Sequence, residues 1–168
     1  PNHFPRLSFG NWVGGDRDGH PLVTTEVTEI CLKRLRTTAL ELLQQQLEAL
    51  RNALSLAGHR QPVPTILQQR ITELQSALGH RGDKVVYGFH REPWRQLVEL
   101  FRQALPESSS RENRNEFSYL RSQDLLQDLR LLRESLLEVG AGRMVRQEVD
   151  PVIRLVQTFG FHLAVLDI

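Results

Sequence analysis

The sequence predicts a mainly α fold in which a long helical region separates two short strands. Leucine and arginine dominate the composition, with 28 Leu and 19 Arg against 2 Lys, and this bias favours helix. Apolar residues recur at three- and four-residue steps over most of the chain. The two ends depart from that spacing. We therefore expect a strand and a loop in residues 1–24, helices over residues 25–158, and a second strand in residues 161–168.

The first 24 residues are rich in glycine, proline and aromatic side chains. Residues 9–15 predict a short strand that runs into a tight loop. Over residues 25–56, apolar side chains return at helical spacing and predict one long amphipathic helix. Thr24 can cap its first turn and Gly58 is placed to end it. At 1.5 Å per residue this helix would be roughly 50 Å long, so we expect it to belong to a larger body or to a helical hairpin.

Two shorter helices are predicted next. The prolines of residues 62–64 break the pattern, and apolar spacing then resumes over residues 67–78. Residues 79–90 mix glycine, charge and a short apolar run, which we interpret as a surface loop. Glu92 and Pro93 then predict the start of a helix that reaches Leu105, because proline is tolerated in the first turn.

The second half of the chain predicts two more helices. Residues 106–115 are polar and typical of a flexible connection. Residues 119–139 carry leucines at helical spacing and predict a helix that ends at two glycines. Asp150 with Pro151 predicts the start of the last helix, and residues 143–149 can extend it upstream with a kink.

The final residues 161–168 are mostly apolar and β-capable, and they are too few for a stable helix, so they predict a buried strand. Within this chain, only residues 9–13 offer that strand a partner. We expect the rest of the sheet to be elsewhere and the chain to be a piece of a larger protein. The single cysteine, Cys31, cannot form an internal disulfide and is expected to pack in the core.

Charge and hydropathy exclude two broad classes of partner. The chain has 21 Lys and Arg against 20 Asp and Glu, a net charge of +1, which gives no general attraction to a polyanion. We therefore expect no nucleic-acid partner. No apolar run approaches the roughly 20 residues that cross a bilayer, so we expect no membrane partner.

The densest motif is residues 14–19, which place three glycines around three charges. One interpretation is a structural turn in which Arg17 pairs with the flanking carboxylates. A calcium loop fails, because its twelfth position is Val27 where a bidentate glutamate is required. A phosphatase aspartate should directly follow an apolar strand, but glycines precede Asp16. A phosphate cradle stays open, although two aspartates would repel the anion unless Arg17 neutralises them.

Six histidines offer no second site. His20 and His162 could act as acid–base groups, but no cysteine, serine or metal-ligand partner stands at a telling spacing, so a structural role is expected for both. The other four lie in predicted loops and are expected to face solvent; they are His3, His59, His80 and His90.

Three stretches resemble one enzyme family. Residues 9–24 resemble the F-x-S-W-[MIV]-G-G-D-R-D-G-N-P-x-V-T segment of the phosphoenolpyruvate carboxylases. Glu92-Pro93-Trp94-Arg95 resembles that family's E-P-Y-R, and residues 159–168 resemble its F-G-x-x-L-x-x-[LI]-D-I-R-Q. The order agrees across the whole chain. The departures are Asn11 for serine, His20 for asparagine and Trp94 for tyrosine.

The resemblance implies a fragment of roughly a fifth of a large, mainly helical enzyme built on a (β/α)8 barrel. It implies that the two short strands are barrel strands, and we expect them to lie side by side in parallel. It also implies that the parent enzyme joins bicarbonate to phosphoenolpyruvate, giving oxaloacetate and phosphate. The family is cytoplasmic in bacteria, usually a homotetramer, and uses Mg2+ or Mn2+. We expect the isolated fragment to bind no metal and to be inactive, because the family's metal-binding carboxylates, phosphate-gripping arginine and catalytic histidine have no counterpart here.

The resemblance also implies a substrate-binding set. By position, Trp12 would line an apolar pocket beside the substrate and exclude water from it. The following residues would shape the same edge of the site, with no proton-transfer role: Gly14, Gly15, Asp16, Arg17, Asp18 and Gly19. The alternative function is a stand-alone helical interaction module that keeps this motif for folding and carries out no catalysis.

Overall fold

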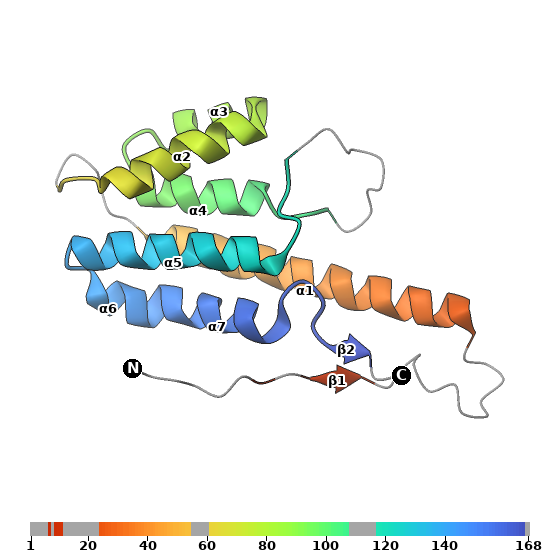
Figure 1. Cartoon of the computed structure of the whole chain (residues 1–168). Helices are drawn as coiled ribbons and strands as arrows, with labels where there is room; N and C mark the ends of the chain where they lie inside the picture. The colour runs from red at the N-terminus through yellow and green to blue at the C-terminus, as the bar shows by residue number, and fades with distance from the viewer. Residues whose placement is uncertain (1–6, 8, 12–23, 55–60, 108–116, 167–168) are drawn as a thin grey trace.

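The computed structural model describes residues 7, 9–11, 24–54, 61–107 and 117–166. Most of these residues are helical, as expected (Figure 1). In chain order the elements are β1 (Gly10–Asn11), α1 (Thr25–Ala53), α2 (Thr65–Leu78), α3 (His80–Gly88), α4 (Pro93–Gln103), α5 (Ser122–Glu138), α6 (Gly142–Met144), the π-helix η1 (Val145–Val149), α7 (Asp150–Phe159) and β2 (Val165–Leu166).

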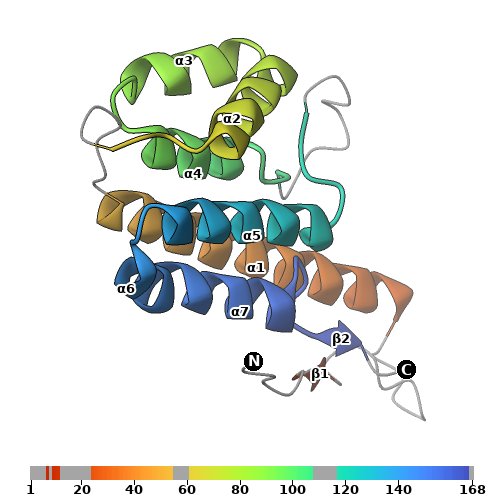
Figure 2. The ribbon, with the colours of Figure 1, turned by 60° about the vertical axis from the view of Figure 1, so that its left-hand side comes forward.

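The helices form two groups, and the long helix α1 contacts helices of both. Figures 1 and 2 show α2, α3 and α4 stacked together on one side, with α5, α1 and α7 beneath them and the two strands beyond α7. Helix α1 packs against both α4 and α7, and α5 packs against α7 and the π-helix. The strands therefore lie at the far edge of the molecule from the α2–α4 group.

The core runs between these helix groups and is continuous. Helix α4 buries residues on all sides, among them Trp94, Leu97 and Phe101. Leu47 of α1 and Leu129 of α5 are also fully buried, so the predicted apolar faces of these helices meet in one core. A buried apolar side chain contributes about 1.5–3 kcal/mol, which makes this the main source of stability.

The first half of α1 lies outside this core. Ile30 is 56% exposed and Val27 is 37% exposed, although both fall on the predicted apolar face. Cys31 is half-buried rather than in the core, so that expectation was wrong. The helix continues past the end of the bundle (Figure 1). Its apolar spacing there has nothing to bury against among the described residues.

The predicted surface loop at residues 79–90 is wrong, because most of it forms helix α3. Gly79 adopts φ +55°, which ends α2 and turns the chain directly into α3. The two helices then pack so closely that a Cβ on Gly82 would lie 2.5 Å from the backbone oxygen of Gln75. His80 lies in α3 and His90 in the turn after it, and both are exposed as expected.

The kink expected upstream of the last helix is present. Helix α7 begins at Asp150, and residues 142–149 extend it through a short α-helix and a π-helix turn. Helix α5 begins at Ser122, later than predicted, because the Asp124 side chain accepts a hydrogen bond from the backbone N–H of Arg121. The predicted connection at residues 106–115 falls mostly outside the described residues.

Only part of residues 161–168 is a strand. Gly160 at φ +54° and Leu163 at φ +49° form a turn that carries the chain from α7 into β2. A positive φ is incompatible with an extended strand, so within residues 161–166 the strand covers only Val165–Leu166. The expected parallel pairing is confirmed, with Gly10 opposite Val165 and Asn11 opposite Leu166.

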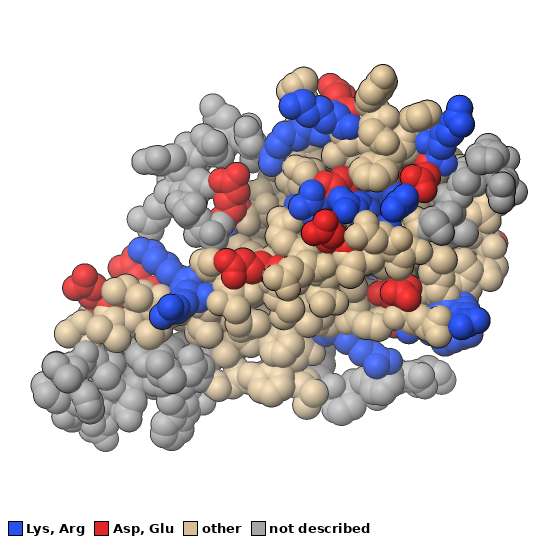
Figure 3. Space-filling model, turned by 180° about the vertical axis from the view of Figure 1, so that it is seen from behind, with Lys and Arg blue, Asp and Glu red and all other residues tan. Residues whose placement is uncertain are grey.

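The surface carries charges of both signs. On the face shown in Figure 3, basic and acidic side chains are interspersed rather than gathered into a patch of one sign. Among the described residues, no helix combines the length and the apolar character needed to cross a membrane.

Candidate functional site

The predicted site adjoins the ends of the two strands. Because β1 and β2 are parallel and in register, Asn11 and Leu166 end at the same edge of the pair. The substrate-binding residues predicted from the sequence follow Asn11 and fall outside the described residues; they are Trp12, Gly14, Gly15, Asp16, Arg17, Asp18 and Gly19. His20 also falls outside. What the structure describes is the framework from which this segment departs.

Both strands are held against the end of α7. The Phe9 ring, just before β1, stacks on the Phe159 ring with centroids 5.4 Å apart and planes 17° apart. The turn into β2 is tight at Gly160, where a side-chain carbon would lie 3.1 Å from the Oγ of Ser122 in α5. The end of the helical bundle therefore sets the position of the strand pair.

His162 links the turn before β2 to α1. Its Nε2 lies 3.5 Å from the Arg36 Nη1, which can donate to it when the imidazole is neutral. Partial burial, followed by the positive charge of Arg36, lowers the pKa of His162 below its ordinary value. The contact therefore favours neutral His162, which is consistent with the structural role expected for it.

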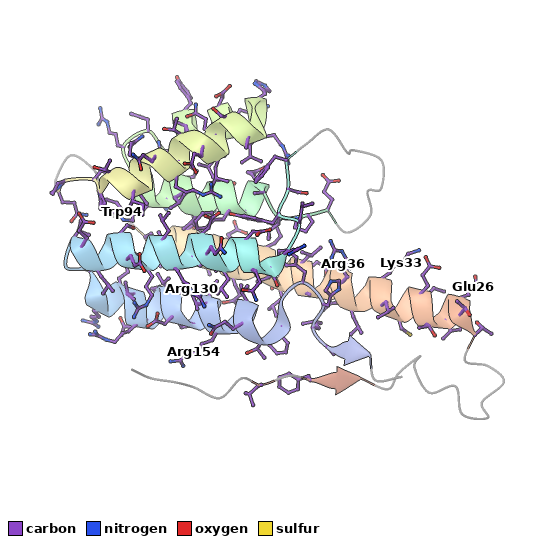
Figure 4. The ribbon with its side chains drawn as sticks, viewed as in Figure 1. Glu26, Lys33, Arg36, Trp94, Arg130 and Arg154 are labelled. Atoms are coloured by element: carbon purple, nitrogen blue, oxygen red, sulfur yellow. The ribbon has the colours of Figure 1, made fainter. Side chains whose placement is uncertain are left out.

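The opposite boundary of the undescribed segment is the N-terminus of α1. The Thr24 hydroxyl accepts a hydrogen bond from the backbone N–H of Val27 at 3.3 Å, which confirms the predicted cap. Glu26 stands in the first turn, where the helix dipole favours a negative charge. Figure 4 shows Glu26, Lys33 and Arg36 in order along the part of α1 that extends past the bundle.

The E-P-W-R stretch lies at the start of α4, away from the strands. The Trp94 side chain is fully buried and its Nε1 donates to Ser135 Oγ at 3.2 Å (Figure 4). Arg95 donates to both carboxylate oxygens of Glu92 and to the backbone oxygen of Arg51. These contacts tie α4 to α1 and α5, so the described structure gives this motif a framework role.

Two buried carboxylates were not anticipated from the sequence. Glu99 accepts hydrogen bonds from Arg51, Arg102 and Gln103, at 2.7–2.9 Å. Burial alone would raise the pKa of Glu99, but these hydrogen bonds outweigh it and hold the pKa below its ordinary value. The sequence carried one signal for this site, because Glu99 is a single acidic residue on an otherwise apolar helical face. A carboxylate buried on such a face needs cationic partners.

The second carboxylate is Asp128 of α5. Arg70 of α2 donates to both of its oxygens, at 2.8 and 3.0 Å, and the Tyr119 hydroxyl donates at 2.6 Å. Burial and the Asp128 charge raise the pKa of Tyr119 well above its ordinary value. This network joins α2, α5 and the segment before α5, and it satisfies a charge that would otherwise be costly to bury.

In the described ranges, no three His, Cys, Asp or Glu side chains come together in a way that could hold a metal ion. The buried carboxylates are instead paired with arginines, which occupy the oxygens that a cation would need. These residues therefore do not fit a Mg2+ or Mn2+ site, and no step through a metal is assigned to them.

Comparison with known proteins decides the family. A family model described as phosphoenolpyruvate carboxylase matches residues 1–168. The chain belongs to the phosphoenolpyruvate carboxylase family. It is 32% identical to the phosphoenolpyruvate carboxylase of Thermus thermophilus over 98% of this chain and 17% of that protein. It is 31% identical to that of Methylorubrum extorquens, over 98% of this chain and 18% of that protein.

This membership confirms the family resemblance drawn from the three sequence stretches. A third phosphoenolpyruvate carboxylase, from Thermosynechococcus vestitus, is 32% identical over 95% of this chain and 17% of that protein. The chain thus spans about a sixth of the length of the curated phosphoenolpyruvate carboxylases it matches. Their size shows that this region is one part of a larger enzyme in those relatives.

Proposed function

We propose that this chain is the segment of a phosphoenolpyruvate carboxylase that forms one edge of the site where phosphoenolpyruvate and bicarbonate become oxaloacetate and phosphate. In this proposal β1 and β2 are neighbouring strands of a (β/α)8 barrel. The observation that carries it is the parallel pairing, since active sites of such barrels lie at the carboxyl ends of their strands. The motif at residues 14–19 follows Asn11, the last described residue of β1.

The overhanging half of α1 supports the same proposal. Val27 and Ile30 are exposed in this part of α1, although their spacing is that of a buried helix face. In the whole enzyme this face packs against further barrel elements that the 168 residues do not supply. The two strands, each two residues long, likewise gain neighbours on their outer edges.

In the proposed reaction Trp12 forms an apolar wall beside the substrate. An indole wall excludes water that would protonate the enolate of phosphoenolpyruvate or capture carbon dioxide. The loop of Gly14, Gly15, Asp16, Arg17, Asp18 and Gly19 shapes the same edge. Mg2+ or Mn2+ and the groups that grip the phosphate come from other parts of the enzyme. We further propose that the whole enzyme is a cytoplasmic homotetramer and that the isolated segment is inactive.

A graft tests the role of Trp12. The 168 residues replace the matching segment of the Thermus thermophilus relative, and oxaloacetate formation from phosphoenolpyruvate, bicarbonate and Mg2+ is followed with a coupled dehydrogenase. We expect activity in the graft, and a loss of about 100-fold in kcat for Trp12→Ala, which corresponds to about 2.7 kcal/mol of transition-state stabilisation. Arg146→Gln, on the exposed π-helix turn, is the control and leaves kcat unchanged.

Two results would contradict the proposal. If Trp12→Ala leaves the graft as active as Arg146→Gln, the loop is not at the substrate. If the isolated chain itself forms oxaloacetate above a no-protein control, the segment is not inactive and must contain the phosphate-binding groups that we assign elsewhere.

A further inference from the structure

A cavity lies among residues of α2, α3 and α4 and of the segments that flank them. Figures 1 and 2 show this helix group on the side of the bundle away from the strands. The volume of the cavity is about 610 Å3, and it opens between the start of α2, the end of α3 and the start of α4. One wall is apolar and formed by Val63, Val86 and Pro93. Such a wall next to a few polar groups is typical of sites for small organic ligands.

Gln96 provides the most constrained polar group in this cavity. Its side chain lines the cavity although the residue is only 6% exposed. The Nε2 donates to the backbone oxygen of Val86 at 3.0 Å, which fixes the orientation of the amide. No donor in the described part of the chain bonds to the Oε1. Since no fully buried side-chain oxygen there lacks a partner, the Oε1 is not fully enclosed, and Gln96 lines the cavity.

Arg91 brings a positive charge to the same cavity, and His90 lines it beside Arg91. Neither forms an ion pair or a side-chain hydrogen bond with the described residues, whereas Arg51, Arg95 and Arg102 are each paired with a carboxylate. A guanidinium presents two parallel N–H groups that match a carboxylate. The only carboxylate adjacent in sequence, Glu92, is already engaged by Arg95.

We propose that this cavity binds a small hydroxylated carboxylate. The carboxylate pairs with Arg91, a hydroxyl donates to the Oε1 of Gln96, and the apolar body lies against Val63, Val86 and Pro93. An inorganic anion would leave the amide oxygen and the apolar wall unused. An uncharged alcohol would leave Arg91 unpaired. The proposal concerns a site remote from the strands and does not depend on the role assigned to Trp12.

The probe is 4-hydroxybenzoate, titrated into the purified, 15N-labelled chain and followed through the side-chain amide signals of Gln96. We expect saturable binding with a Kd of about 1 mM or below. Benzoate lacks the hydroxyl and 4-hydroxybenzyl alcohol lacks the charge, so we expect each to bind at least about tenfold more weakly. Equal binding of benzoate and 4-hydroxybenzoate would overturn the role of Gln96.

Arg91→Gln is the decisive variant, because Arg91 is exposed and its replacement leaves the core intact. We expect it to weaken binding of 4-hydroxybenzoate about tenfold or more, while Arg146→Gln, the same change at an exposed arginine outside the cavity, has no effect. Equal affinities in the two variants overturn the proposal. So does the absence of saturation at about 10 mM probe in a chain whose NMR spectrum shows that it is folded.

Discussion

The helical bundle and the strand edge differ in how completely their polar groups are paired and their apolar side chains are covered. In the bundle, Trp94 reaches Ser135, and the buried carboxylates Glu99 and Asp128 are each bound by arginine. At the strand edge, β1 and β2 pair with each other and with no further strand in the described part of the chain, and Ile30 of α1 is exposed. The bundle therefore has the features of a unit that folds by itself, whereas the strand edge has the features of a surface that needs neighbours.

The largest effect expected from removing a polar side chain concerns the buried network of α5. Asp128→Ala leaves Arg70 and the Tyr119 hydroxyl without their shared acceptor, and we expect it to lower the free energy of unfolding by about 3 kcal/mol in urea titrations. Glu73→Ala removes only the exposed partner of Arg70 and should cost about 1 kcal/mol or less. Equal effects would mean that the bundle does not depend on its buried charges.

The close contact of α2 and α3 ranks next. Gly82→Ala places a Cβ 2.5 Å from the backbone oxygen of Gln75, so the helices must separate, and we expect a loss of about 2 kcal/mol. Gly88→Ala, in the same helix, meets nothing within 4 Å and should change stability by less than about 1 kcal/mol. Thermal unfolding of both variants checks the difference. A harmless Gly82→Ala would refute the close packing.

A smaller effect is expected from the acid dependence of Glu99. Its pKa is lowered in the folded chain, so its hydrogen bonds stabilise the fold above the unfolded pKa of about 4.3. This stability is lost as pH falls from there through the lower folded pKa. We expect Glu99→Gln to reduce that acid-dependent loss in urea titrations between pH 5 and 3. Glu48→Gln, which changes an exposed partner of Arg51, should leave the acid-dependent loss of stability unchanged.

The smallest effect is expected at the strand edge. Ile30→Asp should change the unfolding free energy of the isolated chain by about 0.5 kcal/mol or less, because the side chain is exposed. Leu47→Asp, the same kind of change at a fully buried position of α1, should prevent folding. In the Thermus thermophilus graft, Ile30→Asp should lower the melting temperature, since the proposed barrel covers this face. A graft insensitive to the change would show that the face stays exposed.

Sequence patterns predicted the helices that the spacing of apolar residues defines. They failed where the backbone conformation of a single residue determines the structure. The apolar spacing of α1, α2 and α5 was sufficient to predict those helices. The loop predicted at residues 79–90 was wrong because its mix of glycine, charge and a short apolar run was interpreted as a loop, whereas Gly79, at a positive φ, connects α2 directly to another helix. Likewise, no pattern indicated that Leu163 would take a positive φ and shorten the last strand.

The site was predicted from a motif rather than from geometry. The seven residues assigned to substrate binding stay a prediction, because they lie outside the described part of the chain. The parallel pairing of the strands was expected from the barrel that the family resemblance implies, and it is confirmed. The buried ion pairs could not be anticipated, because the partners Arg70 and Asp128 are 58 residues apart and nothing local links them.

The parallel pairing of β1 with β2 has a consequence for how such a chain can change over time. Parallel neighbours cannot be joined by a tight hairpin, so everything from residue 12 to residue 164 serves as their connection. A connection that leaves and re-enters at adjacent points can lengthen, shorten or be exchanged without altering the register of the strands it joins. The helical bundle is in this sense an insertion, free to acquire its own ligand while the strands keep their place.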